Sequence, residues 1–338
     1  MKSIELPRKV VIGDGAINKI KDICSSIGLE GNALIITGPT TNSVAGKTVK
    51  RILDGDAALV KESSADEIAS VLDKIGGGFD FLAGVGGGNV IDFTKICSFR
   101  SGVPFVSVPT SASHDGIASP LVSLKFKSVK EMGSSTIICT PSAVVADTEI
   151  IRKAPKRLLA AGCADAISNY TAVLDWELAH KEKNTYYGDY AASLSMMSAR
   201  IVMEKAPAIK DDINILVEAL ISSGVAIGIA GSSHPCSGSE HMFSHSLDEI
   251  CEKPALHGEQ CGVGTIMMAY LHGANWKQVR NALQTVGAPT NAKELGIPES
   301  DIIKALTKAH EVRDRYTILR TGIARDDAEK LAQVTGVI

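Results

Sequence analysis

The stretch Phe81-Leu82-Ala83-Gly84-Val85-Gly86-Gly87-Gly88-Asn89-Val90-Ile91-Asp92 decides the fold of the first half of this chain. An apolar run leads through three consecutive glycines into a helical segment, which predicts a strand, a tight turn and a helix. Glycines at such a turn let the backbone approach a ligand, and the N–H groups at the helix start then face an anion, typically a pyrophosphate. The spacing is not Gly-x-Gly-x-x-Gly, so a tight connection that binds no ligand is the alternative interpretation.

The segments around this turn repeat the alternation of strand and helix. Strands are predicted at Ala33–Thr37, Ala57–Val60, Phe79–Val85 and Pro104–Val108. Helices are predicted at Val44–Leu53, Asp66–Ile75 and Val90–Phe99, with Gly38-Pro39-Thr40 as a turn and Ser64 or Asp66 as a helix cap. Strands that alternate with helices of this length indicate a mostly parallel, Rossmann-like α/β sheet.

The second half has helical periodicity and few strand signals. Helices are predicted at Pro155–Trp176, Tyr187–Glu204, Asp212–Ile229, Ser239–Ile250, Gly258–His272, Trp276–Val286 and Ser300–Leu319. The sequence therefore predicts two domains, a dinucleotide-binding α/β domain at 1–152 and an all-helical domain at 153–338. The cleft between them is the expected active site.

Bulk composition restricts the function classes. The chain has 338 residues, 45% of them hydrophobic and 22% charged, and a net charge of −3, so neither nucleic acid nor an anionic membrane is an expected partner. The longest apolar stretch, Ala219–Ala230, is shorter than the roughly 20 residues of a membrane span. The N-terminus lacks an apolar signal-peptide core, and the seven cysteines form no Cys-x-x-Cys pair. We therefore expect a cytoplasmic enzyme with reduced cysteines.

Three histidines lie close together in the second half. His241 and His245 belong to Gly238-Ser239-Glu240-His241-Met242-Phe243-Ser244-His245, and His257 belongs to Ala255-Leu256-His257-Gly258-Glu259-Gln260. Upstream, Asp165 stands among small residues, where a helix could approach an ion closely. Two imidazoles and one carboxylate would suit a catalytic divalent metal. Packing or surface histidines and an ion-paired aspartate are the plainer alternatives.

A hydroxyl-rich loop follows the predicted strand Pro104–Val108. Pro109-Thr110-Ser111-Ala112-Ser113-His114-Asp115-Gly116-Ile117-Ala118-Ser119 begins at the carboxyl end of that strand, the edge where open α/β sheets bind ligands. A solvated serine-rich loop is the alternative.

Taken together, these motifs resemble the family of metal-dependent polyol dehydrogenases that includes glycerol dehydrogenase, iron-containing alcohol dehydrogenases and dehydroquinate synthase. The resemblance covers essentially the whole chain and is most specific at 86–95, 109–116, 238–241 and 256–259. It implies a metal held by Asp165, His241 and His257. It also implies NAD(P) contacts at Gly86, Gly87, Gly88, Asn89, Asp92, Thr110, Ser111, Ser113, Ser119, Leu121 and Lys125.

The string Gly-Ser-Glu-His-x-Phe-Ser-His favours the branch of this family that acts on glycerol 1-phosphate. His114, where glycerol dehydrogenases carry a hydroxyl residue, and Asn89, where family members vary, both weaken a plain glycerol dehydrogenase assignment. The branch implies metal-dependent, NAD(P)H-linked reduction of dihydroxyacetone phosphate to sn-glycerol 1-phosphate, the backbone of archaeal membrane ether lipids.

The expected mechanism follows from the negative charge that develops on a ketone oxygen as hydride arrives. A divalent ion at that oxygen would stabilise this charge. Asp115 is expected to orient a substrate hydroxyl, Asp165 to contact the substrate as well as the metal, and Lys125 and His245 to hold its phosphate. Zinc is the expected ion and iron(II) the alternative, NAD and NADP stay open, and a homo-oligomer is expected.

Three rival functions remain open on the sequence. The first is reduction of an unphosphorylated polyol such as glycerol. The second is a dehydroquinate synthase-like lyase, which would return its nicotinamide oxidised. The third is a non-catalytic protein that binds a metal or a nucleotide.

Overall fold

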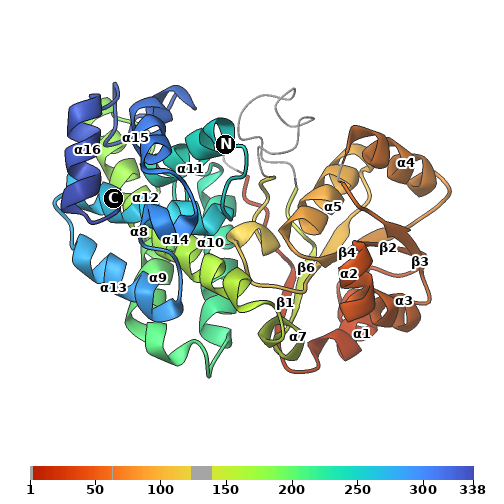
Figure 1. The fold of residues 1–338 in the computed structure, drawn as a ribbon. Coiled ribbons are helices and arrows are strands. Elements are labelled where there is room, and N and C mark those ends of the chain that lie inside the picture. Colours follow the sequence, from red (N-terminus) through yellow and green to blue (C-terminus); the bar gives the residue numbers. More distant parts are fainter. Residues whose placement is uncertain (1–2, 63, 123–138) are drawn as a thin grey trace. The chain divides into compact units, whose positions relative to one another are not determined.

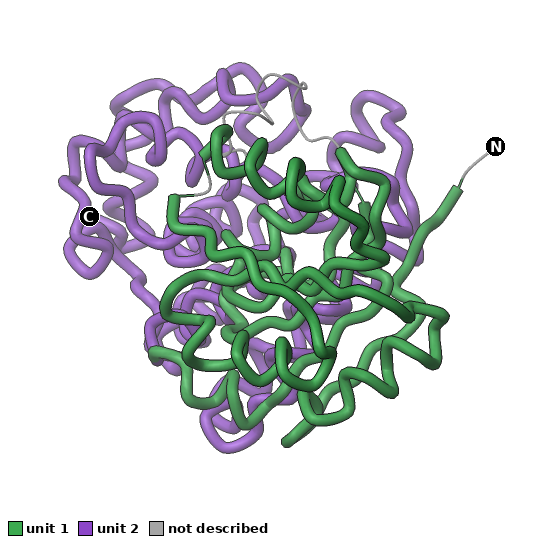
Figure 2. Tube along the Cα trace, turned by 90° about the vertical axis from the view of Figure 1, so that its right-hand side faces the viewer, with its two compact units in different colours: residues 1–155 green, residues 156–338 purple. Residues whose placement is uncertain are grey.

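The computed structural model describes residues 3–62, 64–122 and 139–338. It divides into two compact units, residues 1–155 and 156–338, which Figure 2 shows in different colours. The division falls just after α7 (Thr148–Arg152), the helix at whose end the sequence places the domain boundary. Each unit is described separately.

The first unit contains a parallel sheet of six strands in the order β1-β6-β5-β4-β2-β3. The strands are β1 (Lys9–Gly13), β2 (Ala33–Thr37), β3 (Asp56–Leu59), β4 (Phe81–Gly86), β5 (Phe105–Pro109) and β6 (Ala143–Asp147). The predicted parallel, Rossmann-like α/β domain is confirmed. The sequence interpretation missed β1, which pairs with β6 at one edge of the sheet (Figure 1).

Helices connect the strands of this sheet. They are η1 (Ala16–Lys19), α1 (Ile20–Ser26), α2 (Pro39–Thr41), η2 (Asn42–Gly46), α3 (Lys47–Leu53), α4 (Ala65–Ile75), α5 (Gly88–Ser101), η3 (Asp115–Ile117) and α7. Ser64 caps α4, since its hydroxyl accepts the Glu67 N–H at 3.2 Å. The turn predicted at Gly38-Pro39-Thr40 is wrong. Pro39 opens a helix there, because its fixed φ suits the first helical position, where no N–H is required.

A buried lysine fastens the hydroxyl-rich loop to the helix after the glycine turn. Lys95, fully buried on α5, donates to the Asp92 carboxylate at 3.0 Å. It also donates to the carbonyl oxygens of Gly116 and Leu121, both at 2.7 Å. One ammonium group thus satisfies three acceptors and fixes the far end of the loop 110–121 against α5.

The second unit is helical throughout its regular structure. Its elements are α8 (Lys156–Lys183), α9 (Asp189–Lys205), η4 (Ala206–Ala208), α10 (Asn214–Ala230), α11 (Ser239–Ile250), α12 (His257–Leu271), α13 (Trp276–Val286), α14 (Ala292–Leu295), α15 (Glu299–Lys308), η5 (Ala309–Glu311) and α16 (Arg325–Val334). The helical prediction for this half is confirmed, although α8 extends seven residues beyond the predicted Trp176. The sequence interpretation missed α14 and α16.

The helix predicted at Ser300–Leu319 is wrong in its second half. Residues 300–308 are helical in α15, but a 3-10 turn follows, and the chain from Val312 onward is irregular. The irregular segment is held by tertiary bonds instead of helical ones. The Ile318 N–H donates to the buried Asp175 carboxylate at 2.6 Å, and Arg315 donates to the Ser237 carbonyl oxygen. Local periodicity could not reveal these long-range partners.

Asp175 on α8 is the common partner of three other segments. Its carboxylate accepts the N–H and the hydroxyl of Ser239 at the start of α11, at 2.7 and 2.5 Å. It also accepts from His272 Nε2, just after α12, at 3.0 Å, and from Ile318. The side chain is 2% exposed, so these bonds compensate the burial of its charge.

Close helix contacts bring α8 and α11 onto α12. A Cβ added to Gly258 would lie 2.0 Å from the Ala161 carbonyl oxygen of α8, and one added to Gly264 would lie 3.0 Å from the Phe243 ring of α11. The absence of side chains at these positions lets the three helix backbones approach one another. Functional groups on their facing sides are therefore brought close together.

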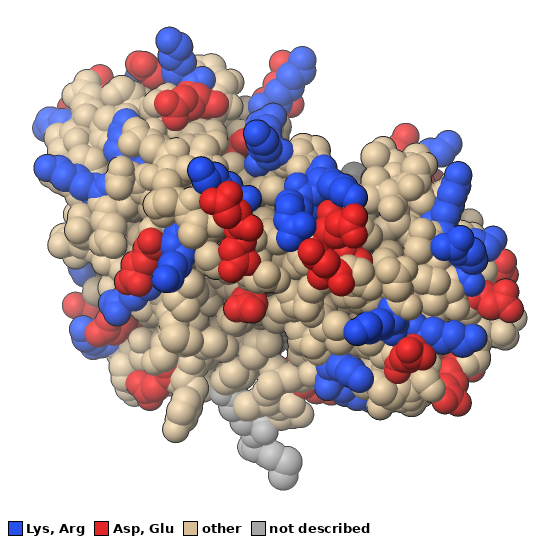
Figure 3. Space-filling model, turned by 90° about the horizontal axis from the view of Figure 1, so that it is seen from below, with Lys and Arg blue, Asp and Glu red and all other residues tan. Residues whose placement is uncertain are grey.

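Charge is mixed on the surface in view in Figure 3, where basic and acidic side chains are interspersed. Within the described ranges, no helix combines the length and the apolar character that crossing a bilayer requires.

Candidate metal centre

Four potential ligands from three helices of the second unit converge on one point. They are Asp165 on α8, His241 on α11, and His257 and Cys261 on α12, and one donor atom of each lies within 4.8 Å of the others. The structure therefore brings together the three residues for which the sequence predicts a metal site. It adds Cys261, which the sequence interpretation missed. Cys261 follows His257 by four positions on one helix, so the i, i+4 spacing could have revealed it.

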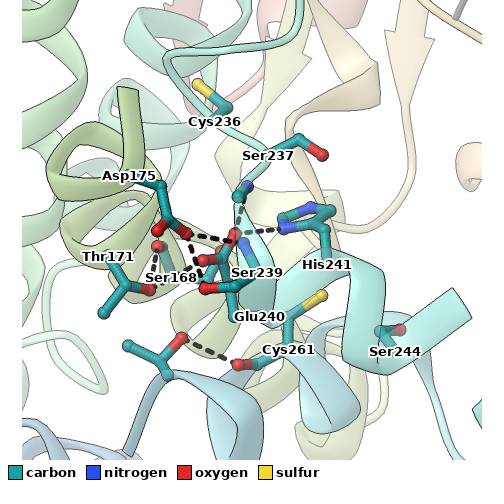
Figure 4. A network of polar contacts seen from close by, with 12 residues as sticks. Ser168, Thr171, Asp175, Cys236, Ser237, Ser239, Glu240, His241, Ser244 and Cys261 are labelled. Atoms are coloured by element: carbon teal, nitrogen blue, oxygen red, sulfur yellow. Dashed lines mark hydrogen bonds and ion pairs between the residues drawn. The ribbon is translucent and has the colours of Figure 1, made fainter. Parts of the chain in front are cut away.

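His241 is oriented by its sequence neighbour. Glu240, fully buried, accepts from His241 Nδ1 at 2.9 Å, from the Gly238 N–H at 2.6 Å and from the Thr171 hydroxyl at 2.8 Å (Figure 4). Burial would raise the pKa of Glu240, but these donors outweigh it and hold the pKa below its ordinary value. An ionised Glu240 fixes the tautomer with a proton on Nδ1 and leaves Nε2 as the metal-binding nitrogen.

His257 has a comparable partner on α11. Its Nδ1 lies 3.2 Å from the Ser244 hydroxyl, and its Nε2 lies 3.8 Å from Asp165 Oδ1. Gln260 in turn donates to the Ser244 hydroxyl at 2.9 Å and to the Ser244 carbonyl oxygen at 3.1 Å. The ring is thus held with Nε2 toward the cluster, as a metal ligand requires.

The start of α12, and with it His257, is fixed by Glu259. Its carboxylate accepts the Leu256 N–H at 3.0 Å, and Arg157 donates to it through two nitrogens at 2.6 and 2.7 Å. This bidentate pair stabilises the first turn of α12 from α8, the helix that carries Asp165.

The donor set fits a divalent ion. Burial disfavours the charged form of His241, yet Cys261 and Glu240 raise its pKa well above its ordinary value, so the surroundings favour a cation at this ring. Burial raises the pKa of Cys261, although His241 opposes this, and metal binding would require loss of the thiol proton. One carboxylate, two oriented imidazoles and one thiol suit zinc or iron(II).

His245 lies beside this cluster without belonging to its four-residue set. Its ring stacks on His257 at a centroid distance of 5.6 Å, and its Nδ1 is 4.0 Å from Asp248 Oδ2. Burial lowers the pKa of His245, and the nearby charges of His241 and Arg313 lower it further. At neutral pH this imidazole is uncharged and can donate one hydrogen bond.

The residues for which the sequence predicts cofactor contacts lie in the first unit. Gly86 ends β4, and Gly87 and Gly88 form the start of α5, where the exposed Asn89 follows. Asp92 lies on α5, and the other described residues with a predicted cofactor contact lie on the hydroxyl-rich loop. Of these residues, Asp92, Thr110, Ser111 and Ser119 are buried, and Ser113 and Leu121 are partly exposed. Asp115, the predicted substrate contact, begins η3. Lys125 lies outside the described residues.

His114 explains why the glycine turn needs Gly88. A Cβ at Gly88 would lie 1.6 Å from His114 Nε2, and His114 Nδ1 accepts the Gly116 N–H at 2.9 Å. The ring therefore packs directly on the turn and holds the loop beside it. This residue, which departs from the glycerol dehydrogenase pattern, is part of the geometry of the turn.

Comparisons with known proteins agree with this architecture. Residues 11–155 match the family model described as iron-containing alcohol dehydrogenase. Over its full length the chain is 53% identical to glycerol-1-phosphate dehydrogenase [NAD(P)+] of Methanosarcina mazei, covering 97% of that protein. It is 50% identical to the enzyme of the same name from Pyrococcus horikoshii, with both chains fully covered.

Solved structures share the fold at low sequence identity. Glycerol dehydrogenase from Schizosaccharomyces pombe matches with a TM-score of 0.82 at 17% identity, covering 99% of this chain and 90% of that one. A probable glycerol dehydrogenase from Sinorhizobium meliloti matches with a TM-score of 0.78 at 22% identity, with both chains fully covered.

Proposed function

This chain belongs to the glycerol-1-phosphate dehydrogenase family, and we propose that it reduces dihydroxyacetone phosphate to sn-glycerol 1-phosphate with NADH or NADPH at a metal centre built from Asp165, His241 and His257. The observation that carries this proposal is the convergence of these three donors with their orienting partners, in a chain about half identical to such enzymes over its whole length.

The side chains around the centre hold its geometry. Glu240 keeps the His241 proton on Nδ1, and Ser244 engages Nδ1 of His257, so both rings present Nε2 to one point. When bound, a divalent ion supplies Lewis-acid stabilisation of the charge that develops on the substrate's carbonyl oxygen. Asp165 contributes the one carboxylate of the set. His245, whose ring stacks on His257, would donate a hydrogen bond to the substrate's phosphate in this proposal.

The first unit supplies the cofactor site in this proposal. Gly87 and Gly88 lie at the start of α5, and in this proposal their N–H groups would donate to the pyrophosphate of the cofactor. Thr110, Ser111, Ser113, Ser119, Leu121 and Lys125 are proposed to line the ribose and nicotinamide positions, and Asp115 to orient a substrate hydroxyl. Either NAD or NADP serves in this proposal.

We propose zinc as the resident ion, because two imidazoles, one carboxylate and the neighbouring Cys261 thiol form a borderline-to-soft donor set. Substitution with cobalt(II) tests the fourth donor. Thiolate coordination gives an intense charge-transfer band in the near ultraviolet, and this band should vanish in Cys261→Ser while the visible cobalt bands persist. Cys163→Ser, a buried thiol of α8 outside the cluster, is the control and should keep the band.

The activity is tested by a stereospecific product assay. The protein is incubated with dihydroxyacetone phosphate and each reduced cofactor, and the product is analysed with an enzyme specific for one glycerol phosphate enantiomer, with metal analysis of the same sample. The proposal requires sn-glycerol 1-phosphate and one oxidised nicotinamide per product. Equal turnover of unphosphorylated dihydroxyacetone would support a polyol dehydrogenase instead, and return of the nicotinamide to its starting redox state would support a lyase.

The remaining parts of the proposal concern cellular context. The product would serve as the backbone of membrane ether lipids, the enzyme would act in the cytoplasm, and it would assemble as a homo-oligomer. Sedimentation of the purified protein tests the last of these.

A further inference from the structure

Two arginines near the candidate metal centre form no ion pair with a carboxylate of the described residues. Arg313 and Arg315 lie on the irregular segment after η5, which packs against α11. Among the residues that the structure describes, no carboxylate oxygen lies within 4.0 Å of either guanidinium. Two neighbouring cations repel each other, and an anion bound between them would offset this repulsion.

The contacts of these arginines leave donors unused. Arg315 donates to the Ser233 hydroxyl at 2.8 Å and to the Ser237 carbonyl oxygen, and Arg313 reaches the Ser233 hydroxyl at 3.3 Å. Arg313 Nε is buried and makes no hydrogen bond within the described parts of the chain. A buried guanidinium N–H without an acceptor is costly, so the geometry fits a ligand that brings acceptor oxygens.

The pKa values of the two arginines show that burial disfavours their charged forms. Burial and the charge of Arg313 lower the pKa of Arg315 to about 9, although the charges of Glu240 and Asp175 act in the opposite direction. Burial also lowers the pKa of Arg313. Both groups remain charged at neutral pH, and both carry a desolvation cost that a bound anion would offset.

The pair contacts the segment that leads into α11. Both guanidinium groups reach the Ser233 hydroxyl, and Arg315 also donates to the Ser237 carbonyl oxygen, just before α11 begins at Ser239. The same helix carries His241 of the candidate metal site and His245, whose ring stacks on His257.

We propose that Arg313, supported by Arg315, binds the phosphate group of the substrate. This inference rests on the proposed function and adds the residues that recognise the phosphate. A guanidinium presents N–H donors in a planar fork that matches phosphate oxygens, and a phosphate monoester carries a charge that balances the two cations. The pair thus distinguishes a phosphorylated ketone from an unphosphorylated one, while the metal centre is common to both.

The test compares two substrates in matched variants. Reduction of dihydroxyacetone phosphate and of dihydroxyacetone is measured for the wild type, Arg313→Gln, Arg313→Lys and the control Arg325→Gln, an exposed arginine on α16. We expect the ratio of the two kcat/KM values to fall about 10- to 100-fold in Arg313→Gln. The ratio should fall less in Arg313→Lys, which keeps a cation, and should not change in Arg325→Gln.

A binding measurement that needs no turnover complements the kinetics. Inorganic phosphate should inhibit the wild type in competition with dihydroxyacetone phosphate and should raise its Tm, and Arg313→Lys, the milder variant, should show a weaker effect of both kinds. The zinc content of each variant should equal that of the wild type, because neither arginine belongs to the donor cluster.

The outcomes separate the two levels of the proposal. A wild type that prefers dihydroxyacetone phosphate, with the same preference and the same phosphate inhibition in both Arg313 variants, would overturn the phosphate site and leave the proposed function intact. A wild type that shows no preference for the phosphorylated ketone would overturn the proposed function itself.

Discussion

Removing the carboxylate of Glu240 should weaken metal binding, although Glu240 is not one of the four candidate ligands. Its Oε1 accepts both His241 Nδ1 and the Gly238 N–H, and its Oε2 accepts the Thr171 hydroxyl. Glu240→Gln keeps the shape and one acceptor oxygen but removes the charge. Glu240→Leu also removes the acceptor, so that the His241 ring loses the partner that fixes its tautomer.

The expected magnitude follows from this series. Partners that orient a metal-binding histidine contribute about 10- to 100-fold to metal affinity, or ~1.4–2.7 kcal/mol. We expect Glu240→Gln near the lower end, because the hydrogen bond survives without its charge, and Glu240→Leu near the upper end. The dissociation constant for zinc is measured by competition between the metal-free protein and a chromophoric chelator.

A nearby carboxylate provides the control. Asp175 belongs to the same buried network but contacts neither His241 nor any other residue of the donor cluster (Figure 4). Asp175→Asn should lower the free energy of unfolding yet change zinc affinity less than Glu240→Gln does. If both Glu240 variants bind zinc within about twofold of the wild type, a value below the effect of any orienting partner, the reasoning about the tautomer is refuted.

Three further predictions concern other parts of the chain. Lys95→Met should lower the free energy of unfolding of the first unit by about 3–5 kcal/mol, because the buried Asp92 carboxylate loses its cation. Denaturant titration measures this loss of stability. Adding Asp92→Asn to the Lys95→Met variant should restore part of the lost stability. Burial, assisted by nearby arginines, lowers the pKa of His234 to about 3, so the native state excludes a proton that the unfolded chain binds below about pH 6.5. Stability should therefore fall by about 2 kcal/mol from about pH 7 to about pH 5, and an unchanged pH slope in His234→Gln would contradict this. Gly88→Ala places a methyl group against the His114 ring and should raise the KM for NAD(P)H about tenfold or more. Adding His114→Ala to this variant should lower the KM again toward the wild-type value. Equal KM values in the wild type, the single variant and the double variant would count against a tightly packed turn.

The regular parts of the fold could be predicted from local patterns. Apolar runs such as Ala33–Thr37 and Phe81–Gly86 are short, bounded by turn residues and fully buried, and the helix Ala65–Ile75 between them is amphipathic. The strand Lys9–Gly13 could not be found in this way, because it is largely half-exposed at an edge of the sheet and its pairing with β6 spans most of the first unit. Edge strands depend on their partner more than on their own sequence.

The convergence of Asp165, His241 and His257 is predictable because these residues are few and chemically distinctive. The family motifs point to all three, and the structure brings them together. Glu240 could have been identified as an orienting residue from its position before His241. The arginines at 313 and 315 could not, since the pattern around them favours a helix, whereas long-range bonds to Asp175 and Ser237 hold the segment in an irregular course.

The carboxylate of Asp175 has a consequence for the dynamics of the second unit. It holds the amide hydrogens of Ser239 and Ile318, which belong to segments far apart in the sequence, on one side chain. Neither amide can exchange with solvent deuterium unless this junction opens. Both should therefore exchange at a common, slow rate that reports opening of the unit as one cooperative block, rather than fraying of single helix ends.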